Sequence, residues 1–386
     1  MRPDASDFRA DINGLRAVAV IAVVLFHFGV AGFSGGFVGV DVFFVISGYL
    51  MTRIILGPLA EGRFSVLRFY LARARRIFPA LTVLCVLMLA YGWFTLSPID
   101  YKLLSKHAGT SLLFLSNQVY WKESGYFDAD AHEKWLLHTW SLSVEWQFYL
   151  LYPLMILAAA RLFRRQAGMA GFLWAVFFAS LAWSGWLALA NPSKAFFLLP
   201  TRAWEMLAGG LIYLHQDACA RHTRGRRWVE GLGIAVIVLS SLLFSPNSAW
   251  PGLNALFPVV GTMLVLANGA GNASFLGNAA LQGIGRWSYS IYLWHWPIVV
   301  WLSQSQSRRD GAWIAAGMAA SIALGWLSFR LVENPARSLV SRLKLAPALA
   351  TCAAMVLLPF AVAAVLHFNN DQLMTLRFKD HPRLAD

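Results

Sequence analysis

Arginine and histidine side chains occur inside the apolar segments of this 386-residue chain, where ionisable groups are rare. Arg16 and His27 lie eleven residues apart in the first such segment. Because eleven residues make about three helical turns, both side chains would lie on one helix face, about 16 Å apart along the axis. An ionisable group inside a bilayer is costly unless it is paired or hydrated, so both are candidate functional residues. A histidine in this position can take a proton from an attacking hydroxyl group, or accept an acyl group itself.

The next candidate is Glu145, in the segment HTWSLSVEWQFYLLYP. Counted from His138, Glu145 lies about 10 Å below the outer end of its helix, at a depth similar to that of His27. We therefore expect Glu145 to orient His27 as a base. The alternative for each residue is that its side chain only bonds to a neighbouring helix.

Two further acidic residues are weaker candidates. Asp41 lies in GGFVGVDVFFVISGYLM, whose first glycines favour close helix packing or a broken helix entry. A structural role is the main alternative for Asp41. Glu205 lies beside Arg202, and we expect these two residues to form a structural ion pair.

Aromatic residues and a histidine recur in the segment RWSYSIYLWHWPIVVW. Tyr289, Tyr292 and His295 follow one another at a spacing of three, which places them on one helical stripe. Packing or interface anchoring is the usual role of membrane tyrosines. His295, followed closely by Pro297, is a better candidate for a residue that lines a cavity.

Arg73 and Arg76 lie three residues apart in the segment RFYLARARRIFPA. Two guanidinium groups on one helix face suit the recognition of phosphate groups. The alternative is that these arginines contact lipid headgroups and set the topology. Glu333, in the segment VENPAR, could pair with one of them. The three cysteines are too scattered for a disulfide framework or a zinc site, and no metal is expected.

The elements that position these residues are predicted to be membrane-spanning helices. Hydrophobic residues make up 58% of the chain and charged residues 13%, outside the range of soluble proteins. Apolar stretches of about twenty residues, long enough to cross a bilayer, recur along the chain. We predict an all-α bundle of eleven spans. These are residues 13–33, 37–56, 77–97, 138–160, 171–190, 202–216, 229–245, 252–268, 286–304, 311–331 and 346–367.

The net charge of +13 follows the positive-inside rule and does not indicate nucleic-acid binding. With a cytoplasmic N-terminus, the clusters around Arg73, Arg164, Arg224 and Arg337 lie inside, and the C-terminus lies outside. The segment 107–121 would move most later clusters outside if it crossed, so we expect it not to cross. Loop 98–137 is then an ordered re-entrant or surface region on the outer face. That loop contains Asp128, Asp130, Glu133 and Lys134. One basic pair, Arg308 and Arg309, is also expected on the outer side.

Seven segments in this order make the sequence resemble acyltransferase family 3, the membrane O-acyltransferases of bacterial surface glycans. They are ADINGLRAVAVIAVVLFHF, GGFVGVDVFFVISGYLM, RARR, WSLSVEWQFYLLYP, RAWEMLAGG, YSIYLWHWP and ENP, within residues 10 to about 338. The resemblance implies that His27 is the catalytic histidine, that Arg16 supports it, and that Arg73 and Arg76 bind the acyl-coenzyme A donor. Four other residues occupy motif positions that look functional: Glu145, Tyr292, His295 and Glu333.

By this resemblance the protein is a multi-pass enzyme of the bacterial inner membrane. It would transfer an acyl group, usually acetyl, from cytoplasmic acyl-coenzyme A to a hydroxyl group of a surface carbohydrate such as lipopolysaccharide O-antigen. Two other functions stay open. One is a glycan or lipid transporter, which would use similar intramembrane charges. The other is an acyl conduit that only delivers the acyl group to a partner.

The resemblance also divides the chain. Residues 1–338 would form the ten-span acyltransferase domain, and residues 339–386 an additional span with a periplasmic tail. This arrangement is similar to the subgroup in which a periplasmic SGNH hydrolase-like domain follows the membrane part. Residues after 346 contain neither a Gly-Asp-Ser block nor an Asp-x-x-His pair. We therefore expect either a truncated sequence or a separate SGNH-type partner.

Overall fold

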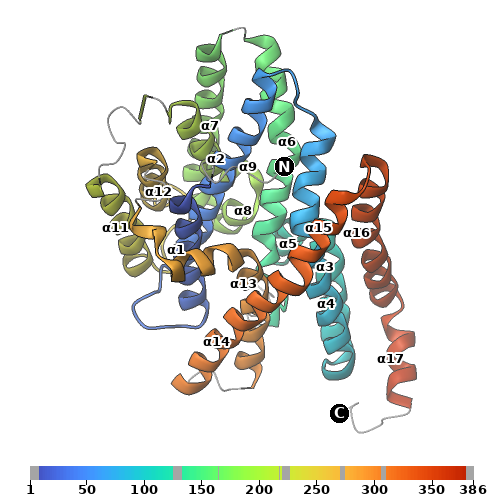
Figure 1. The fold of residues 1–386 in the computed structure, drawn as a ribbon. Helices are drawn as coiled ribbons and strands as arrows, with labels where there is room; N and C mark the ends of the chain where they lie inside the picture. Colours follow the sequence, from blue (N-terminus) through green and yellow to red (C-terminus); the bar gives the residue numbers. More distant parts are fainter. Residues whose placement is uncertain are drawn as a thin grey trace. The chain divides into compact units, whose positions relative to one another are not determined.

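The computed structural model describes residues 8–124, 133–163, 165–216, 218–219, 227–269, 274–305 and 310–379. These residues form helices joined by short turns, and the described part of the chain contains no strand (Figure 1). The all-α prediction is therefore confirmed. Several residues used in the topology argument lie outside the described residues: Asp128, Asp130, Arg164, Arg224, Arg308 and Arg309.

Eleven of the described helices overlap with the predicted spans. They are α1 (Ala10–His27), α2 (Gly39–Ala60), α3 (Val66–Thr95), α6 (Thr139–Leu162), α7 (Gln166–Ala190), α9 (Leu199–Leu214), α11 (Arg227–Leu243), α12 (Leu256–Asn268), α13 (Ala279–Gln304), α14 (Gly311–Ser328) and α16 (Leu345–Phe368). The shorter elements are η2 (Gly36–Val38), α4 (Pro98–Leu112), α5 (Ser116–Glu123), α8 (Pro192–Phe197), η5 (Phe275–Gly277), η7 (Phe329–Glu333), α15 (Asn334–Arg342) and α17 (Asn370–Lys379).

Seven stretches of helix in the described part are long and apolar enough to cross a membrane, judged by length and composition. They are α1, η2 with α2, α3, α6, α7, α14 continued through α15, and α16. Large apolar side chains on them are exposed, including Phe94 at 73%, Leu189 at 79% and Phe368 at 82%. Such surfaces are expected where a protein contacts lipid. The chain is therefore a multi-pass membrane protein, and the count of eleven spans with its orientation stays a prediction.

The chain forms two compact units. The first contains Met1–Val66 and Val144–Tyr292, and the second contains Leu67–Ser143 and Leu293–Asp386. The division into residues 1–338 and 339–386 stays a prediction.

In the first unit, α2 packs against α1, α9 and α12, α9 packs against α7, and α11 packs against α12. Glycines permit the closest approaches, as predicted for the entry to α2. A Cβ atom on Gly36 or Gly39 would overlap the backbone of α1. The entry is also broken, because the single turn η2 precedes α2. On the other side of α2, Gly48 lies against the backbone of Met206, and Gly209 of α9 lies against that of Val45.

In the second unit, α4 packs against α5, α16 and α17. The predicted ordered region 98–137 is confirmed for α4 and α5. The chain turns between these helices at Phe114, whose φ is 56°. Neither helix alone is long enough to cross a bilayer, so the segment 107–121 is not a continuous span. The tail expected after residue 367 is partly helical, since α17 packs against α4 and Asn370 donates to the carbonyl oxygen of Pro98 at 3.0 Å.

Candidate functional site

The predicted catalytic histidine, His27, is the last residue of α1. The first predicted span extends to residue 33 and is therefore too long. The helix ends because Gly29 and Gly32 have φ values of 70° and 86°, which glycine adopts at little cost. Arg16 lies on the same helix, and both side chains are half-buried.

Glu145 of α6 accepts hydrogen bonds from two hydroxyl groups. One belongs to Ser47 of α2 and the other to Tyr149, one turn further along α6; Tyr149 is also 3.2 Å from Ser47. Glu145 therefore does bond to a neighbouring helix, α2. Its role as the residue that orients His27 stays a prediction.

Asp41 and Glu205 both lie within ion-pair distance of Arg202. The expected structural pair between Arg202 and Glu205 is confirmed, and Asp41 belongs to the same buried cluster. The cluster joins α2 to α9.

Two predicted residues lie on α13. In the first unit, the ring of Tyr292 is 6.4 Å from that of Phe43 in an edge-to-face arrangement, which fits the packing alternative. In the second unit, His295 is fully buried, and its ring is 5.8 Å from the ring of His138. The neighbouring Trp296 donates to the carbonyl oxygen of Lys134 at 2.9 Å. His138 lies directly before an apolar segment, and nothing in its position along the sequence indicates its contact with His295.

The arginines near the start of α3 meet the segment that follows α14. Arg337 of α15 lies within electrostatic range of Arg75 and Arg76, which repel it, and of Glu333, which attracts it. The Nε atom of Arg75 is buried and has no hydrogen-bond partner among the described residues. Glu333 thus acts on Arg337, which also adjoins Arg75 and Arg76, and its pairing with Arg73 or Arg76 stays a prediction. The spacing of three residues indicated a pair of Arg73 and Arg76. It could not indicate Arg337, which lies more than 250 residues further along the chain.

Glu333 is the last residue of η7, a turn of π-helix between α14 and α15. Pro335 follows at the start of α15 and has no N–H group to donate to the carbonyl of Leu331. The wider π-turn accommodates this missing bond, and π-turns often occur at functional sites. Glu333 is buried.

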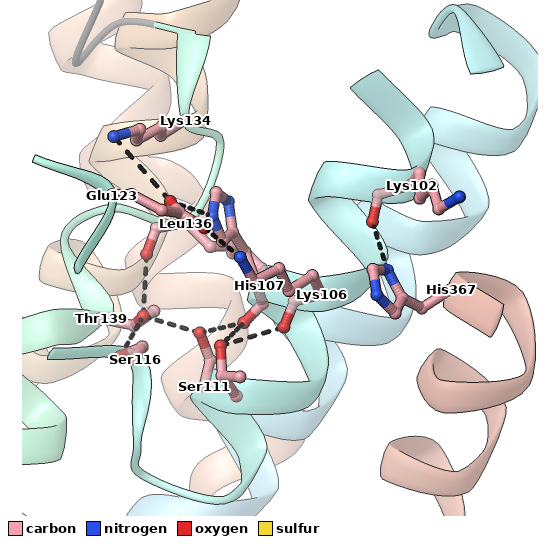
Figure 2. A network of polar contacts seen from close by, with 11 residues as sticks. Lys102, Lys106, His107, Ser111, Ser116, Glu123, Lys134, Leu136, Thr139 and His367 are labelled. Atoms are coloured by element: carbon pink, nitrogen blue, oxygen red, sulfur yellow. Dashed lines mark hydrogen bonds and ion pairs between the residues drawn. The ribbon is translucent and has the colours of Figure 1, made fainter. Parts of the chain in front are cut away.

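A polar network that the sequence analysis missed joins α4, α5 and the segment before α6 (Figure 2). The Glu123 carboxylate accepts from Lys106 at 2.7 Å and lies 2.8 Å from Nε2 of His107; Lys134 is 3.9 Å away. Burial opposes the ionised form of Glu123, but the hydrogen bonds from His107 and Lys106 outweigh it and hold the pKa at about 2. Burial lowers the pKa of His107, and Glu123 offsets this only in part.

Hydroxyl groups continue this network (Figure 2). Ser111 donates to the carbonyl oxygen of His107 and lies 2.7 Å from Oγ1 of Thr139, which lies 3.1 Å from Oγ of Ser116. All three hydroxyl-bearing residues are buried. Buried hydroxyl groups need such partners, so the network fixes α4 and α5 against the start of α6. Among the described residues, no three histidine, cysteine or acidic side chains lie together as a metal site.

Comparison with known proteins gives the following matches. A protein-family model described as an acyltransferase domain, family 3, matches residues 9–330. BcsY of Komagataeibacter xylinus, whose name describes a membrane-bound transacylase, is 32% identical over 93% of this chain and 91% of its own length. The peptidoglycan O-acetyltransferase OatA of Listeria monocytogenes is 30% identical, and the O-acetyltransferase OatA of Staphylococcus aureus is 29% identical. Each covers 84% of this chain, which spans only 55% and 57% of their lengths. No solved structure matches the chain significantly.

Proposed function

Because this chain belongs to the acyltransferase family 3, we propose that it transfers an acyl group from cytoplasmic acyl-coenzyme A to a hydroxyl group of a cell-surface carbohydrate. Acetyl is the proposed acyl group, and acetyl-coenzyme A the donor. The observation that carries the proposal beyond the family is the cluster of Arg75, Arg76 and Arg337.

The arginine cluster supports binding of a polyanionic donor. Its guanidinium groups repel one another, and Glu333 is the acidic residue that acts on Arg337. A phosphate group would relieve this repulsion and offer oxygen acceptors to a buried donor such as Nε of Arg75. Coenzyme A carries several phosphates. In this proposal Arg73 and Arg76 remain the predicted donor-binding pair, and Arg75 and Arg337 complete it.

The proposed chemistry uses His27 as the general base. Its imidazole takes the proton of the acceptor hydroxyl while the oxygen attacks the thioester carbonyl carbon. The carbon–sulfur bond then breaks, and the coenzyme A thiolate leaves and takes up a proton. In the two-step alternative His27 first carries the acyl group itself. Arg16 would stabilise the thioester end of the donor, and Glu145 would orient His27.

The acceptor is proposed from the relatives' names. One OatA is named a peptidoglycan O-acetyltransferase, which favours a cell-wall glycan; the lipopolysaccharide O-antigen predicted from the sequence is the alternative. The bacterial inner membrane is the proposed location. Since the chain spans little more than half of each OatA, we also propose that a periplasmic SGNH-type domain, on the same or another chain, can complete the transfer. In that case this chain would act as an acyl conduit.

Release of coenzyme A from acetyl-coenzyme A by the protein in nanodiscs tests the proposal. We expect His27→Ala to abolish release, and Arg73→Ala/Arg76→Ala to raise the donor concentration for half-maximal rate. His215→Ala and Arg63→Ala serve as matched controls, because both side chains are exposed. Acyl product on an added glycan would distinguish a full transferase from a conduit. A folded protein that does not bind the donor would refute the acyltransferase function and favour the transporter.

A further inference from the structure

The buried cluster on α2 and α9 contains one cation and two acids. Nη1 of Arg202 lies 3.0 Å from Oδ1 of Asp41 and 2.9 Å from Oε1 of Glu205. The side chain of Arg202 is 1% exposed, and those of Asp41 and Glu205 are 0% exposed. The guanidinium is also flanked by the rings of Phe44 and Phe196, at 5.3 and 5.7 Å from their centroids. Water therefore has little access to these charges.

The two carboxyl groups leave oxygen atoms unsatisfied. Oδ2 of Asp41 and Oε2 of Glu205 are buried and have no hydrogen-bond partner among the described residues. Oδ1 of Asp41 and Oε1 of Glu205 contact the same Nη1 atom of Arg202, so the two acids are neighbours in the cluster. Two ionised carboxylates cannot hydrogen-bond to each other, because both are acceptors only. A proton on one of them would supply the missing donor.

The charge balance around the cluster also indicates a proton on one of the two acids. Among the described elements packed against α2 and α9, α7 and α12 carry no ionisable side chain. The others contribute Asp11, which pairs with Arg9, together with Arg16 and His27 on α1 and Lys194 on α8. The helices α2 and α9 themselves also carry Tyr49, Arg53 and Tyr213. The cation that acts on both carboxyl groups is Arg202. With both acids ionised the cluster would have a net charge of −1 in a site sealed from water, which is strongly unfavourable.

We propose that Asp41 and Glu205 share one bound proton, so that the cluster is a buried proton-binding site made of one guanidinium, one carboxylate and one carboxyl group. The carboxyl O–H donates to the other acid, and Arg202 neutralises the remaining carboxylate. The two acids then titrate as a pair. The bound proton holds α2 to α9 at the level of this cluster. This site is independent of the proposed acyl transfer.

Infrared spectroscopy of the protein in nanodiscs tests the proposal. At pH 7.5 we expect a carbonyl-stretch band of a protonated carboxylic acid that shifts in heavy water. The band should be lost in Asp41→Asn and equally in Glu205→Gln, because either change leaves a neutral pair of one acid and Arg202. Glu61→Gln is the control, since Glu61 is exposed and outside the cluster. A band unchanged in both variants would overturn the proposal.

Stability gives a second readout that does not depend on the band. Either single variant mimics the proposed charge state, so its melting temperature should stay near that of the wild type. The double variant leaves Arg202 buried without an acid and should lower the melting temperature clearly. If both acids were ionised and a metal cation balanced them, the wild type would lack the band. Its melting temperature would then rise in sodium chloride relative to choline chloride, and that result would also overturn the proposal.

Discussion

Substitution of Gly48 by alanine would force apart the two helices at the centre of the first unit. Gly48 lies in α2, where it faces the backbone of α9. A Cβ atom at this position would overlap the carbonyl oxygen of Met206 and lie 2.5 Å from its carbonyl carbon and 2.8 Å from its Cα. Real Cβ atoms are in ordinary contact only from 3.4 Å outward. Because the atoms in the way are backbone, no rotamer change can relieve the clash.

The helices would have to separate by roughly 1.5 Å to relieve the overlap with the carbonyl oxygen of Met206. Overpacking of this kind costs about 1–3 kcal/mol. The separation would also stretch the 3.0 Å contact between Arg202 and Asp41 beyond about 4 Å if the helices move as rigid bodies. That distance is beyond hydrogen-bonding range, so the charge-assisted bond, worth about 1.5–3 kcal/mol, would weaken. We expect Gly48→Ala to be among the most destabilising alanine substitutions in α2.

Thermal unfolding in nanodiscs, followed by tryptophan fluorescence, measures this effect. Gly171→Ala in α7 is the matched control, because a Cβ atom there meets nothing within 4 Å. Alanine is a better helix former than glycine by up to about 1 kcal/mol, so the control should keep or raise the melting temperature. A Gly48→Ala protein that melts with the wild type would refute the close packing of α2 on α9.

Three further predictions concern the polar clusters. The pKa of Glu123 is about 2 in the folded protein, against roughly 4.3 in the unfolded chain. The ionised carboxylate therefore stabilises the fold fully above about pH 4.3, and this stabilisation is lost as the pH falls towards 2. Burial lowers the pKa of His107, so the unfolded chain binds the proton first as the pH falls below roughly 6.5. Hydrogen exchange of α4 and α5, corrected for intrinsic rates, should therefore accelerate from pH 7 to 3, and Glu123→Gln should flatten the acidic part of this dependence. Arg337→Ala should raise the half-saturating donor concentration in the coenzyme A assay, whereas Lys344→Ala at an exposed position should not. Tyr149→Phe removes one of the two hydroxyl groups that bond to Glu145 and should cost about 0.5–1.5 kcal/mol in thermal unfolding.

The helices could be predicted from the sequence because a membrane span needs only length and apolar composition. Their ends were harder to predict. The first span was expected to continue to residue 33, but Gly29 and Gly32 end it at His27. Hydropathy does not register such a turn, since the residues beyond it, such as Phe33, are apolar as well. Residues after 367 were expected to form a polar tail, yet α17 is helical and packs on α4.

The sequence was enough to predict individual candidate residues of the site, but not which residues contact one another. The cost of burying a charge identifies Glu145 as unusual, but only the fold shows that Ser47 and Tyr149 bond to it. His107 and Glu123 lie in a loop region where polar residues are common, so their types alone gave no signal. Their significance comes from burial and from the 2.8 Å contact between them.

The arginines of this chain differ in what balances them, and this difference indicates what each cluster binds. The positive-inside rule treats them alike, as charges that orient spans. Arg202, however, lies between two buried acids, so its cluster has one negative charge too many and requires a proton or another cation. Arg337 is repelled by Arg75 and Arg76 and attracted by Glu333, so among the groups that act on Arg337 positive charge is in excess and an anion would be favoured. We therefore propose a bound proton at the first cluster, whose charges are buried, and a phosphate-bearing donor at the second, whose arginines are partly buried or exposed.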